Sequence, residues 1–320
     1  MNIAVISYWH VHAEGYTKEI LEKTDSKITA IWDENAERGQ KYAEQFGATF
    51  YGDYDELLRD KSIDAVIITS ATSEHTGLIL RAIEAGKKIF SEKVLALTTK
   101  ECLEIKEALE KKGEQITLSL VKKCDPEFLF AKKFVQSGAL GRITYARMRN
   151  VHNGSIGNWL PEHFYSLEQC GGGAMIDLGA HPMYLLNWIL GQPKTVQSVF
   201  TDITGHGVED NAVSVIEFEG GAVGVSETGF VSVYTPATLE ISGTKGTLLV
   251  RNGVTYATEE TNGVWVSPEL PQPLPSPLVQ WATGIEGAEG VTFGIEDSIM
   301  LTRMMEAAYK SYHSGKKETV

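Results

Sequence analysis

The chain is poor in cysteine and has no cysteine spacing typical of a zinc site. Only Cys102, Cys124 and Cys170 occur in 320 residues, and no two of them form a Cys-x-x-Cys pair. An odd number of widely separated cysteines argues against a disulfide framework and against a structural zinc site. The fold must therefore depend on buried apolar side chains.

Positive charge and long apolar runs are also scarce. The net charge is −13, and no basic stripe of the kind that binds nucleic acid is present. No run of eighteen apolar residues occurs, and no basic segment leads into an apolar one at the N-terminus. With 42% hydrophobic residues, the chain is typical of a soluble protein of about two domains. We expect no nucleic-acid or membrane partner and a cytoplasmic location.

The first third of the chain alternates short apolar strands with helical segments. Such an alternation predicts βαβ units and a doubly wound parallel sheet. In this fold the ligand crevice lies at the carboxyl ends of the strands. The predicted strands are residues 2–6, 28–32, 64–68, 88–90 and 116–118.

The pattern changes after about residue 120. A helix is predicted at 126–136 and a strand at 143–151, and residues 195–266 alternate in the manner of an antiparallel sheet. Residues 268–277 are rich in proline and predict a surface loop, and a last helix is predicted at 295–312. We therefore predict an N-terminal Rossmann domain at 1–121 and a C-terminal α+β domain with a large, mainly antiparallel open sheet at 122–320.

A glycine-rich loop is missing after the first predicted strand. Dinucleotide folds usually place glycines there so that the backbone can approach the pyrophosphate. Residues 7–15 instead read Ser-Tyr-Trp-His-Val-His-Ala-Glu-Gly. Three interpretations stay open: a divergent loop in which a helix N-terminus and His10 or His12 still meet the phosphates, an altered or lost cofactor site, or histidines that face a substrate or a metal. Because the His-x-His pair has no identified third ligand, we expect no metal.

A second glycine tract, at residues 171–173, leads into an apolar helical pattern. Asp177 and His181 are four residues apart, a spacing that puts both side chains on one face of a helix. A carboxylate beside an imidazole suits proton transfer at neutral pH, and the glycines would let a ligand approach the backbone. The alternative is a glycine loop followed by a helix with two polar residues on its solvated side.

Several segments, in this order and spacing, resemble the Gfo/Idh/MocA family of oxidoreductases. They are residues 64–69 (Asp-Ala-Val-Ile-Ile-Thr), His75, residues 85–93 (Ala-Gly-Lys-Lys-Ile-Phe-Ser-Glu-Lys), residues 137–143 (Ser-Gly-Ala-Leu-Gly-Arg-Ile), the 171–181 tract and residues 306–317. The resemblance implies a Rossmann domain, a second domain with a large open sheet, and NAD(P)-dependent oxidation or reduction of sugars, polyols or related compounds. It also implies a homodimer or homotetramer that packs through that sheet.

The resemblance implies roles for individual residues. Lys93 matches a lysine that contacts the nicotinamide ribose and the substrate, although Val94 stands where the family has proline. His181 matches the catalytic or substrate-contacting histidine, and we propose it as the general base, with Lys93 positioning the substrate oxygen and Asp177 orienting the substrate or the imidazole. An acid that often follows the histidine would fall at Tyr184. The expected cofactor-binding residues are Ser7, Trp9, His10, Asp33, Arg38, Thr69, Ser70, His75, Glu92 and Lys93.

Asp33 ends the second predicted strand. An acid at this position hydrogen-bonds the adenosine ribose and disfavours a 2′-phosphate, which favours NAD. Arg38 lies close enough in sequence to accommodate that phosphate, so NADP stays possible. Asp33 is equally suited to cap the following helix.

A group of aromatic, amide and imidazole side chains lies between the strand at 143–151 and the second glycine tract. Such a composition suits polyhydroxylated ligands, although an ordinary structured loop is an equal alternative for each residue. With Asp177 and His181, the expected substrate-binding residues are His152, Trp159 and His163. We thus predict an NAD(P)-dependent dehydrogenase that acts on CH–OH groups. The alternatives are a non-catalytic nucleotide- or ligand-sensing relative, or a redox-neutral hydrolase or epimerase that uses NAD.

Overall fold

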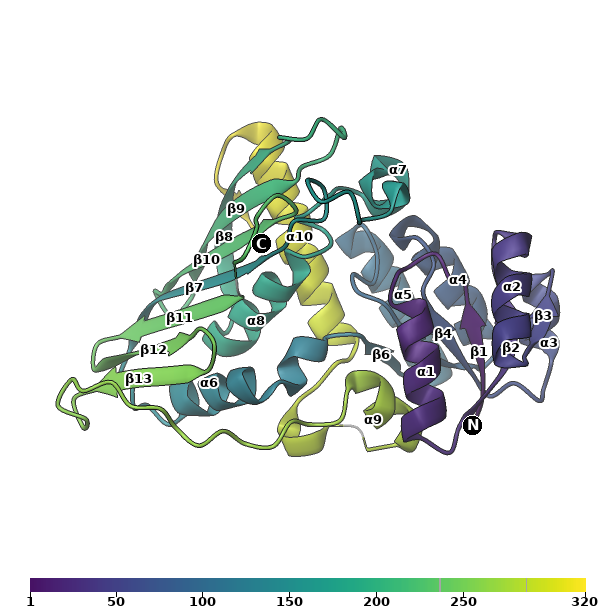
Figure 1. The fold of residues 1–320 in the computed structure, drawn as a ribbon, viewed down its shortest axis with the longest axis horizontal. Coiled ribbons are helices and arrows are strands. Elements are labelled where there is room, and N and C mark those ends of the chain that lie inside the picture. Colours follow the sequence, from purple (N-terminus) through teal and green to yellow (C-terminus); the bar gives the residue numbers. More distant parts are fainter. Residues whose placement is uncertain (236, 286) are drawn as a thin grey trace. The chain divides into compact units, whose positions relative to one another are not determined.

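The computed structural model describes residues 1–235, 237–285 and 287–320. The chain divides into two compact units (Figure 1). The first comprises residues 1–121 and 275–302, and the second comprises residues 122–274 and 303–320. The first unit includes residues 1–121, the range predicted from the sequence. Residues 275–302, which the sequence analysis places in the second domain, belong to the first unit. Within the described residues, no helix is both long and apolar enough to cross a membrane.

The first unit is built on a six-stranded parallel sheet in the order β3-β2-β1-β4-β5-β6. The central strand β4 is buried at every position, as expected for a sheet that is covered on both faces. This confirms the predicted doubly wound fold. The strands are β1 (Asn2–Ile6), β2 (Lys27–Trp32), β3 (Thr49–Tyr51), β4 (Ala65–Ile68), β5 (Lys88–Ser91) and β6 (Ile116–Leu118).

Local sequence signals fix several of the helices. Asn35 caps α2 and Gly47 ends it in the left-handed conformation, while Thr98 and Glu101 form a capping box at the start of α5. On one face of the sheet, α1, α2 and α9 share a core, and on the other α4 packs against α5, β4 and β5. The helices are α1 (Ala13–Lys23), α2 (Ala36–Phe46), α3 (Tyr54–Arg59), α4 (Thr72–Glu84), α5 (Thr99–Lys112) and α9 (Pro277–Thr283).

Helix α9 belongs to this unit although it lies far along the chain. Its residues Leu278 and Trp281 are buried in the same core as β1, α1 and β5. The Trp281 ring lies 5.7 Å from that of Phe90, measured between centroids. The returning segment therefore completes the hydrophobic core of the first unit.

The second unit contains an eight-stranded sheet in the order β13-β12-β11-β7-β10-β9-β8-β14. Only the β7–β10 pair is parallel among the strand pairs of this described sheet, so the predicted open, mainly antiparallel sheet is confirmed. The strands are β7 (Ile143–Val151), β8 (Pro193–Thr201), β9 (Asn211–Phe218), β10 (Val223–Gly229), β11 (Thr238–Gly243), β12 (Gly246–Val250), β13 (Val254–Thr258) and β14 (Glu318–Thr319).

Helices cover one face of this sheet (Figure 1). Helix α8 (Ala180–Leu190) packs against β7 and β10, and α6 (Pro126–Gln136) packs against α8. The C-terminal part of α10 (Ile295–Ser314) reaches β8, where the Ser311 hydroxyl accepts the Ser198 N–H. The short α7 (Leu167–Cys170) precedes the glycine tract.

The expectation that Asp177 and His181 share one helix is wrong. Helix α8 begins at Ala180, and Asp177 lies in the turn that precedes it. The Gly179 N–H bonds to the Ala174 carbonyl five residues back, and the His181 N–H bonds to the Leu178 carbonyl three residues back. Because these bonds depart from the regular four-residue step of an α-helix, the face predicted from the spacing does not form.

Candidate active site

The carboxyl ends of β1, β4 and β5 carry a group of buried polar residues. Such residues need partners inside the protein, because burying an unpaired polar group is costly. The loop after β1 and the loop after β4 supply those partners to each other. The Thr69 hydroxyl donates to the Ser7 carbonyl at 2.6 Å, and the Thr69 carbonyl accepts the His10 N–H at 3.0 Å. The buried residues are Ser7, His10, Thr69, Ser70, Ser91, Glu92 and Lys93.

Ser7 forms the tight turn that a glycine usually makes. Its φ is 74°, in the left-handed region that favours glycine. The Gly-x-Gly-x-x-Gly spacing, begun at Ser7, falls next on Trp9 and His12. The chain thus keeps the turn of a dinucleotide loop, while side chains stand at its second and third glycine positions.

The backbone N–H groups of this loop already have acceptors. Those of Tyr8 and Trp9 bond to Asp33 Oδ2 at 2.8 Å and to Ser7 Oγ at 3.0 Å. The His12 N–H bonds to Nδ1 of His10 at 3.2 Å. In a glycine loop such donors face the pyrophosphate. Here a phosphate would have to replace side chains of the protein as their acceptor.

Asp33 and Arg38 form a partly buried ion pair at the end of β2. Arg38 Nη2 lies 2.7 Å from Asp33 Oδ1, and Arg38 Nε lies 2.9 Å from Oδ2. The Asp33 side chain also accepts the Asn35 N–H at 2.8 Å. The capping residue of α2 is Asn35, so the capping alternative for Asp33 is not what the structure shows.

Glu92 faces both histidines of the loop after β1. Its Oε1 lies 2.6 Å from His12 Nδ1 and 3.8 Å from His10 Nδ1, and it accepts the Tyr16 hydroxyl. Burial alone would raise the pKa of Glu92, but the facing His10 and His12 outweigh it and hold the pKa well below its usual range. The carboxylate is therefore ionised at neutral pH.

Lys93 follows Glu92 and is also buried, and its N–H donates to Glu92 Oε2 at 2.7 Å. The peptide bond between Lys93 and Val94 is cis. His75 lies behind this loop, 1% exposed, with Nδ1 3.0 Å from the Val94 carbonyl and Nε2 3.2 Å from the Ser70 carbonyl. Burial lowers the pKa of His75. His75 therefore connects two loops instead of presenting a face to a ligand.

In the second unit, the glycine tract packs against the chain's own residues. A Cβ at Gly172 would lie 1.9 Å from the Tyr309 hydroxyl, and one at Gly173 would lie 2.1 Å from the Glu209 carbonyl oxygen. Glu209 Oε1 accepts the N–H groups of Gly173 and Met175, each at 2.9 Å, and the Tyr309 hydroxyl at 2.6 Å. These two glycines therefore make room for Glu209 and Tyr309, not for a ligand. The sequence offers no local signal for Glu209.

His181 is buried in the first turn of α8. Its Nδ1 lies 2.9 Å from the Tyr184 hydroxyl, which also accepts the Lys122 N–H at 3.1 Å. Tyr184 stands where the family pattern often has an acid, and here it orients the imidazole. Asp177, half-buried before the helix, acts electrostatically on His152, whose pKa is lowered mainly by burial and raised in part by Asp177.

The structure brings two of the three further substrate candidates together. The rings of His152 and Trp159 lie 4.6 Å apart, and the Trp159 indole N–H donates to the Asn153 side chain at 3.1 Å. The His163 ring lies 5.1 Å from that of the neighbouring Phe164. A cavity of about 490 Å³ opens beside His152 and Asn153, and it is also lined by Val151, Ser232, Tyr234, Thr235 and Asn252.

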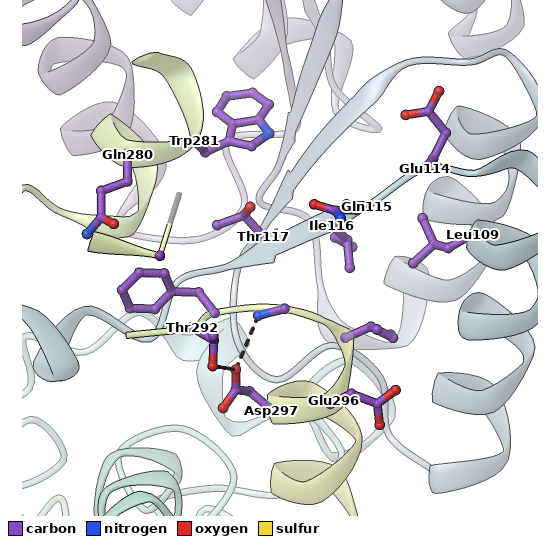
Figure 2. Close-up of a pocket in the computed structure, with 14 residues that line it drawn as sticks. Leu109, Glu114, Gln115, Ile116, Thr117, Gln280, Trp281, Thr292, Glu296 and Asp297 are labelled. Carbon is purple, nitrogen blue, oxygen red and sulfur yellow. Dashed lines mark hydrogen bonds between the residues drawn. The ribbon is translucent and has the colours of Figure 1, made fainter. Parts of the chain in front are cut away.

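Another cavity, of about 450 Å³, lies in the first unit (Figure 2). It opens beside β6 and is lined by Gln115, which precedes that strand, and by Trp281 of α9. Asp297 closes one side and accepts the Thr292 hydroxyl at 2.8 Å. Because the cavity lies at the amino end of β6, it is separate from the carboxyl edge where a dinucleotide binds.

Two profiles of one protein family match the chain. Residues 1–120 match the profile described as "Oxidoreductase family, NAD-binding Rossmann fold", and residues 128–249 match the GFO/IDH/MocA C-terminal domain. Scyllo-inositol 2-dehydrogenase (NAD(+)) of Bacillus subtilis is 28% identical over 239 residues, which cover 70% of this chain and 66% of that protein. Myo-inositol 2-dehydrogenase of Thermotoga maritima is 27% identical over 238 residues, covering 71% and 69%.

Solved structures share the fold over the whole chain. Levoglucosan dehydrogenase in complex with NADH superposes with a TM-score of 0.86 at 21% identity, covering 100% of this chain and 99% of that one. GenD2 from gentamicin A biosynthesis, in complex with NAD, gives a TM-score of 0.85 at 23% identity and covers 100% and 96%. The two profiles, which match residues 1–120 and 128–249, show that the chain belongs to the Gfo/Idh/MocA family of oxidoreductases, which has an NAD-binding Rossmann domain.

Proposed function

We propose that the protein transfers hydride between a nicotinamide cofactor and a carbon that bears a hydroxyl group in a sugar, polyol or related compound. The observation that carries the proposal is the placement of Glu92 and Lys93 directly after β5, at the carboxyl edge of a sheet whose sequence matches an NAD-binding profile. The named activities of the inositol dehydrogenase relatives support the substrate class.

Two features of the first unit suit a dinucleotide: the left-handed turn after β1 and the acid at the end of β2. Two other positions, where the dinucleotide pattern has glycine, carry larger side chains. Ser7 keeps the left-handed turn, and Asp33 with Arg38 stands at the end of β2. Trp9 and His12 occupy the positions of the second and third glycines. We propose that the cofactor lies along this edge, near Ser7, Trp9, His10, Asp33, Arg38, Thr69, Ser70, Glu92 and Lys93, with NAD preferred and NADP as the alternative.

The chemistry that the cofactor supplies is the acceptance or donation of hydride. The proton of the substrate hydroxyl must then pass to or from a side chain. We assign that transfer to His181, whose imidazole is held by the Tyr184 hydroxyl. Lys93 supplies a positive charge that positions the substrate oxygen. Asp177 orients the substrate or the imidazole of His181, which lies four residues later.

The substrate would be held by side chains of the second unit. A ring such as Trp159, 54% exposed, can stack on the C–H face of a sugar, and Asn153 and His152 offer polar groups beside it. The cavity next to His152 gives room for a small ligand. His163, in the same segment, is the remaining candidate.

Apolar side chains on the exposed face of the second unit's sheet support self-association through that face. Val199 and Val213 are exposed partners across β8 and β9, and Val215 lies across from Val225 of β10. A contiguous apolar patch of this kind marks an interaction surface more often than a solvated one. We propose a homodimer or homotetramer, acting in the cytoplasm on a small-molecule substrate.

Cofactor binding tests the proposal most directly. The thermal unfolding midpoint would be measured with and without NAD⁺, NADH, NADP⁺ and NADPH, because a ligand of the native state must raise its stability. We expect stabilisation by NAD⁺ or NADH, followed by NADH formation when inositols or monosaccharides are added. Stabilisation by none of the four would contradict the dehydrogenase and favour a sensing relative. A cofactor that co-purifies and does not exchange would favour a redox-neutral enzyme.

A further inference from the structure

Three metal-ligating side chains converge at the carboxyl edge of the first sheet. His10 and His12 come from the loop after β1, and Glu92 comes from the end of β5, eighty residues later than His12. One ligand atom from each residue lies within 4.8 Å of the other two. The sequence pairs the histidines but leaves out their third partner, because Glu92 reaches them only through the pairing of β4 with β1 and β5.

The carboxylate is held so that one oxygen faces the histidines. Glu92 Oε2 accepts the Lys93 N–H at 2.7 Å, which leaves Oε1 directed at the imidazoles and at Tyr16. Nδ1 of His10 accepts the His12 N–H at 3.2 Å, so this nitrogen is unprotonated, and a metal ion would replace that N–H at its one lone pair. Two imidazole nitrogens and one carboxylate oxygen are the donor set of many catalytic zinc sites.

We propose that His10, His12 and Glu92 bind one divalent transition-metal ion of the zinc class. Bonds of about 2.0–2.2 Å in a tetrahedral arrangement place ligand atoms about 3.3 Å apart. The distance from His10 Nδ1 to Glu92 Oε1, 3.8 Å, is already close to that value. The distance from His12 Nδ1 to Glu92 Oε1, 2.6 Å, has to open, and the His12 side chain, 48% exposed, has solvent on the side toward which it would move.

The surroundings suit a site with an open position. Three protein ligands leave a fourth position for water or a substrate oxygen, as in catalytic sites and unlike closed structural ones. The Tyr16 hydroxyl bonds to Glu92 Oε1 and to Ser119 Oγ, so the carboxylate has the outer hydrogen bonds that usually orient a metal ligand. One of the three ligands, His12, stands at the third glycine position of the dinucleotide pattern. Metal binding would therefore explain why this loop has histidines where the pattern has glycine.

Metal titration of the whole chain tests the proposal without cofactor or activity. Metal-free protein would be titrated with CoCl₂ while the visible absorption is recorded, and with ZnCl₂ in a calorimeter. We expect one ion per chain, a cobalt spectrum of four- or five-coordinate geometry, and displacement of cobalt by zinc. His12→Ala should lose at least about a hundredfold in affinity, because even an outer partner of a ligand is worth ten- to a hundredfold.

The controls separate this site from adventitious binding and from misfolding. His313→Ala removes an exposed histidine in another part of the chain and should leave the titration unchanged. His10→Ala and Glu92→Gln should weaken binding as His12→Ala does, each with circular dichroism to confirm the fold. The proposal is overturned if wild-type protein binds neither ion, or if His12→Ala binds both as tightly as wild type. A failure of nicotinamide binding would leave this result untouched.

Discussion

Arg38 holds both carboxylate oxygens of Asp33, with Nη2 2.7 Å from Oδ1 and Nε 2.9 Å from Oδ2. The carboxylate also accepts the Tyr8 N–H, and its side chain has no exposed surface. The guanidinium, a quarter exposed, is thus the more accessible partner. A ribose hydroxyl can hydrogen-bond to Asp33 only if Arg38 moves away from the carboxylate. A 2′-phosphate can bind the exposed side of the guanidinium without that movement.

Arg38→Ala should therefore shift cofactor preference toward NAD. Removal of a charge-assisted hydrogen bond to the 2′-phosphate costs about 1.5 kcal/mol or more, or roughly tenfold in affinity. The measurement is the ratio of dissociation constants for NADPH and NADH in wild type and variant. Arg38→Lys, which keeps the charge but not the paired donors, should fall between them. An equal loss for both cofactors would assign Arg38 a purely structural role.

His181→Ala should lower kcat by about 10²–10⁴-fold, the usual contribution of a general base. Tyr184→Phe removes the hydroxyl that orients the imidazole. It should cause a smaller loss and should shift the pH–rate profile, because the surroundings of His181 change while the base remains. Turnover of His181→Ala within about tenfold of wild type would show that another group moves the proton.

Gly173→Ala should destabilise the second unit strongly. The new Cβ would lie 2.1 Å from the Glu209 carbonyl oxygen, which is backbone and cannot rotate away. Overpacking of this kind costs about 1–3 kcal/mol. Gly15→Ala is the matched control, since nothing lies within 4 Å of its Cβ in α1, and it should stabilise by up to about 1 kcal/mol. Urea unfolding measures both, and equal stability of the two variants would contradict the packing argument.

Glu209→Gln should change how stability depends on pH. Burial raises the pKa of Glu209 above its ordinary value of 4.5, although hydrogen bonds from Tyr309 and the Gly173 backbone lower it in part. The folded state then binds the proton more tightly than the unfolded state, so ionised Glu209 costs stability above the folded pKa and the cost disappears as pH falls below 4.5.

The glutamine variant lacks this cost and keeps an oxygen for the same donors. Its free energy of unfolding, relative to wild type, should therefore rise with pH between 4.5 and neutrality. Denaturant unfolding at several pH values gives the difference. A difference that stays flat over this range, or falls, would show that the raised pKa of Glu209 does not affect stability.

Val215→Lys should disrupt self-association while leaving the fold intact. Val215 is exposed on β9 and lies opposite Gln197 of β8 and Val225 of β10, in the middle of the exposed valines. A charge there opposes burial of the sheet against a second copy. Light scattering after size exclusion should show a smaller mass for the variant than for wild type. Thr201→Lys, at the end of the same exposed face, is the milder control.

Local patterns predicted much of the fold. The strand at 143–151 and the helix at 126–136 have the predicted bounds, because their periodicity and the turn at Gly138 and Gly141 are encoded in neighbouring residues. The return of residues 275–302 to the first unit was not predicted. It depends on the burial of Leu278 and Trp281 against residues of β1 and β5, and no local signal reports such a distant contact.

The site was predicted less completely, for the same reason. The resemblance to the family predicted Lys93, Glu92 and His181 as site residues, and these stay predictions. The spacing assigned Asp177 to a helix that in fact starts three residues later. The sequence also interpreted the glycines at 172 and 173 as room for a ligand, because the carboxylate that fills this space, Glu209, comes from the loop before β9. Residues four apart in the sequence lie on one face of a helix only where that helix is regular and includes both of them.

The return of α9 has a consequence for biosynthesis. A ribosome completes β6 long before it has made Leu278 and Trp281, so the nascent Rossmann sheet lacks part of its core while residues 122–274 of the second unit are translated. N-terminal domains generally fold first during synthesis. Here the core beside Phe90 is complete only when the returning segment has been made. The first unit, although it contains the N-terminus, is therefore complete only after most of the second unit has been made.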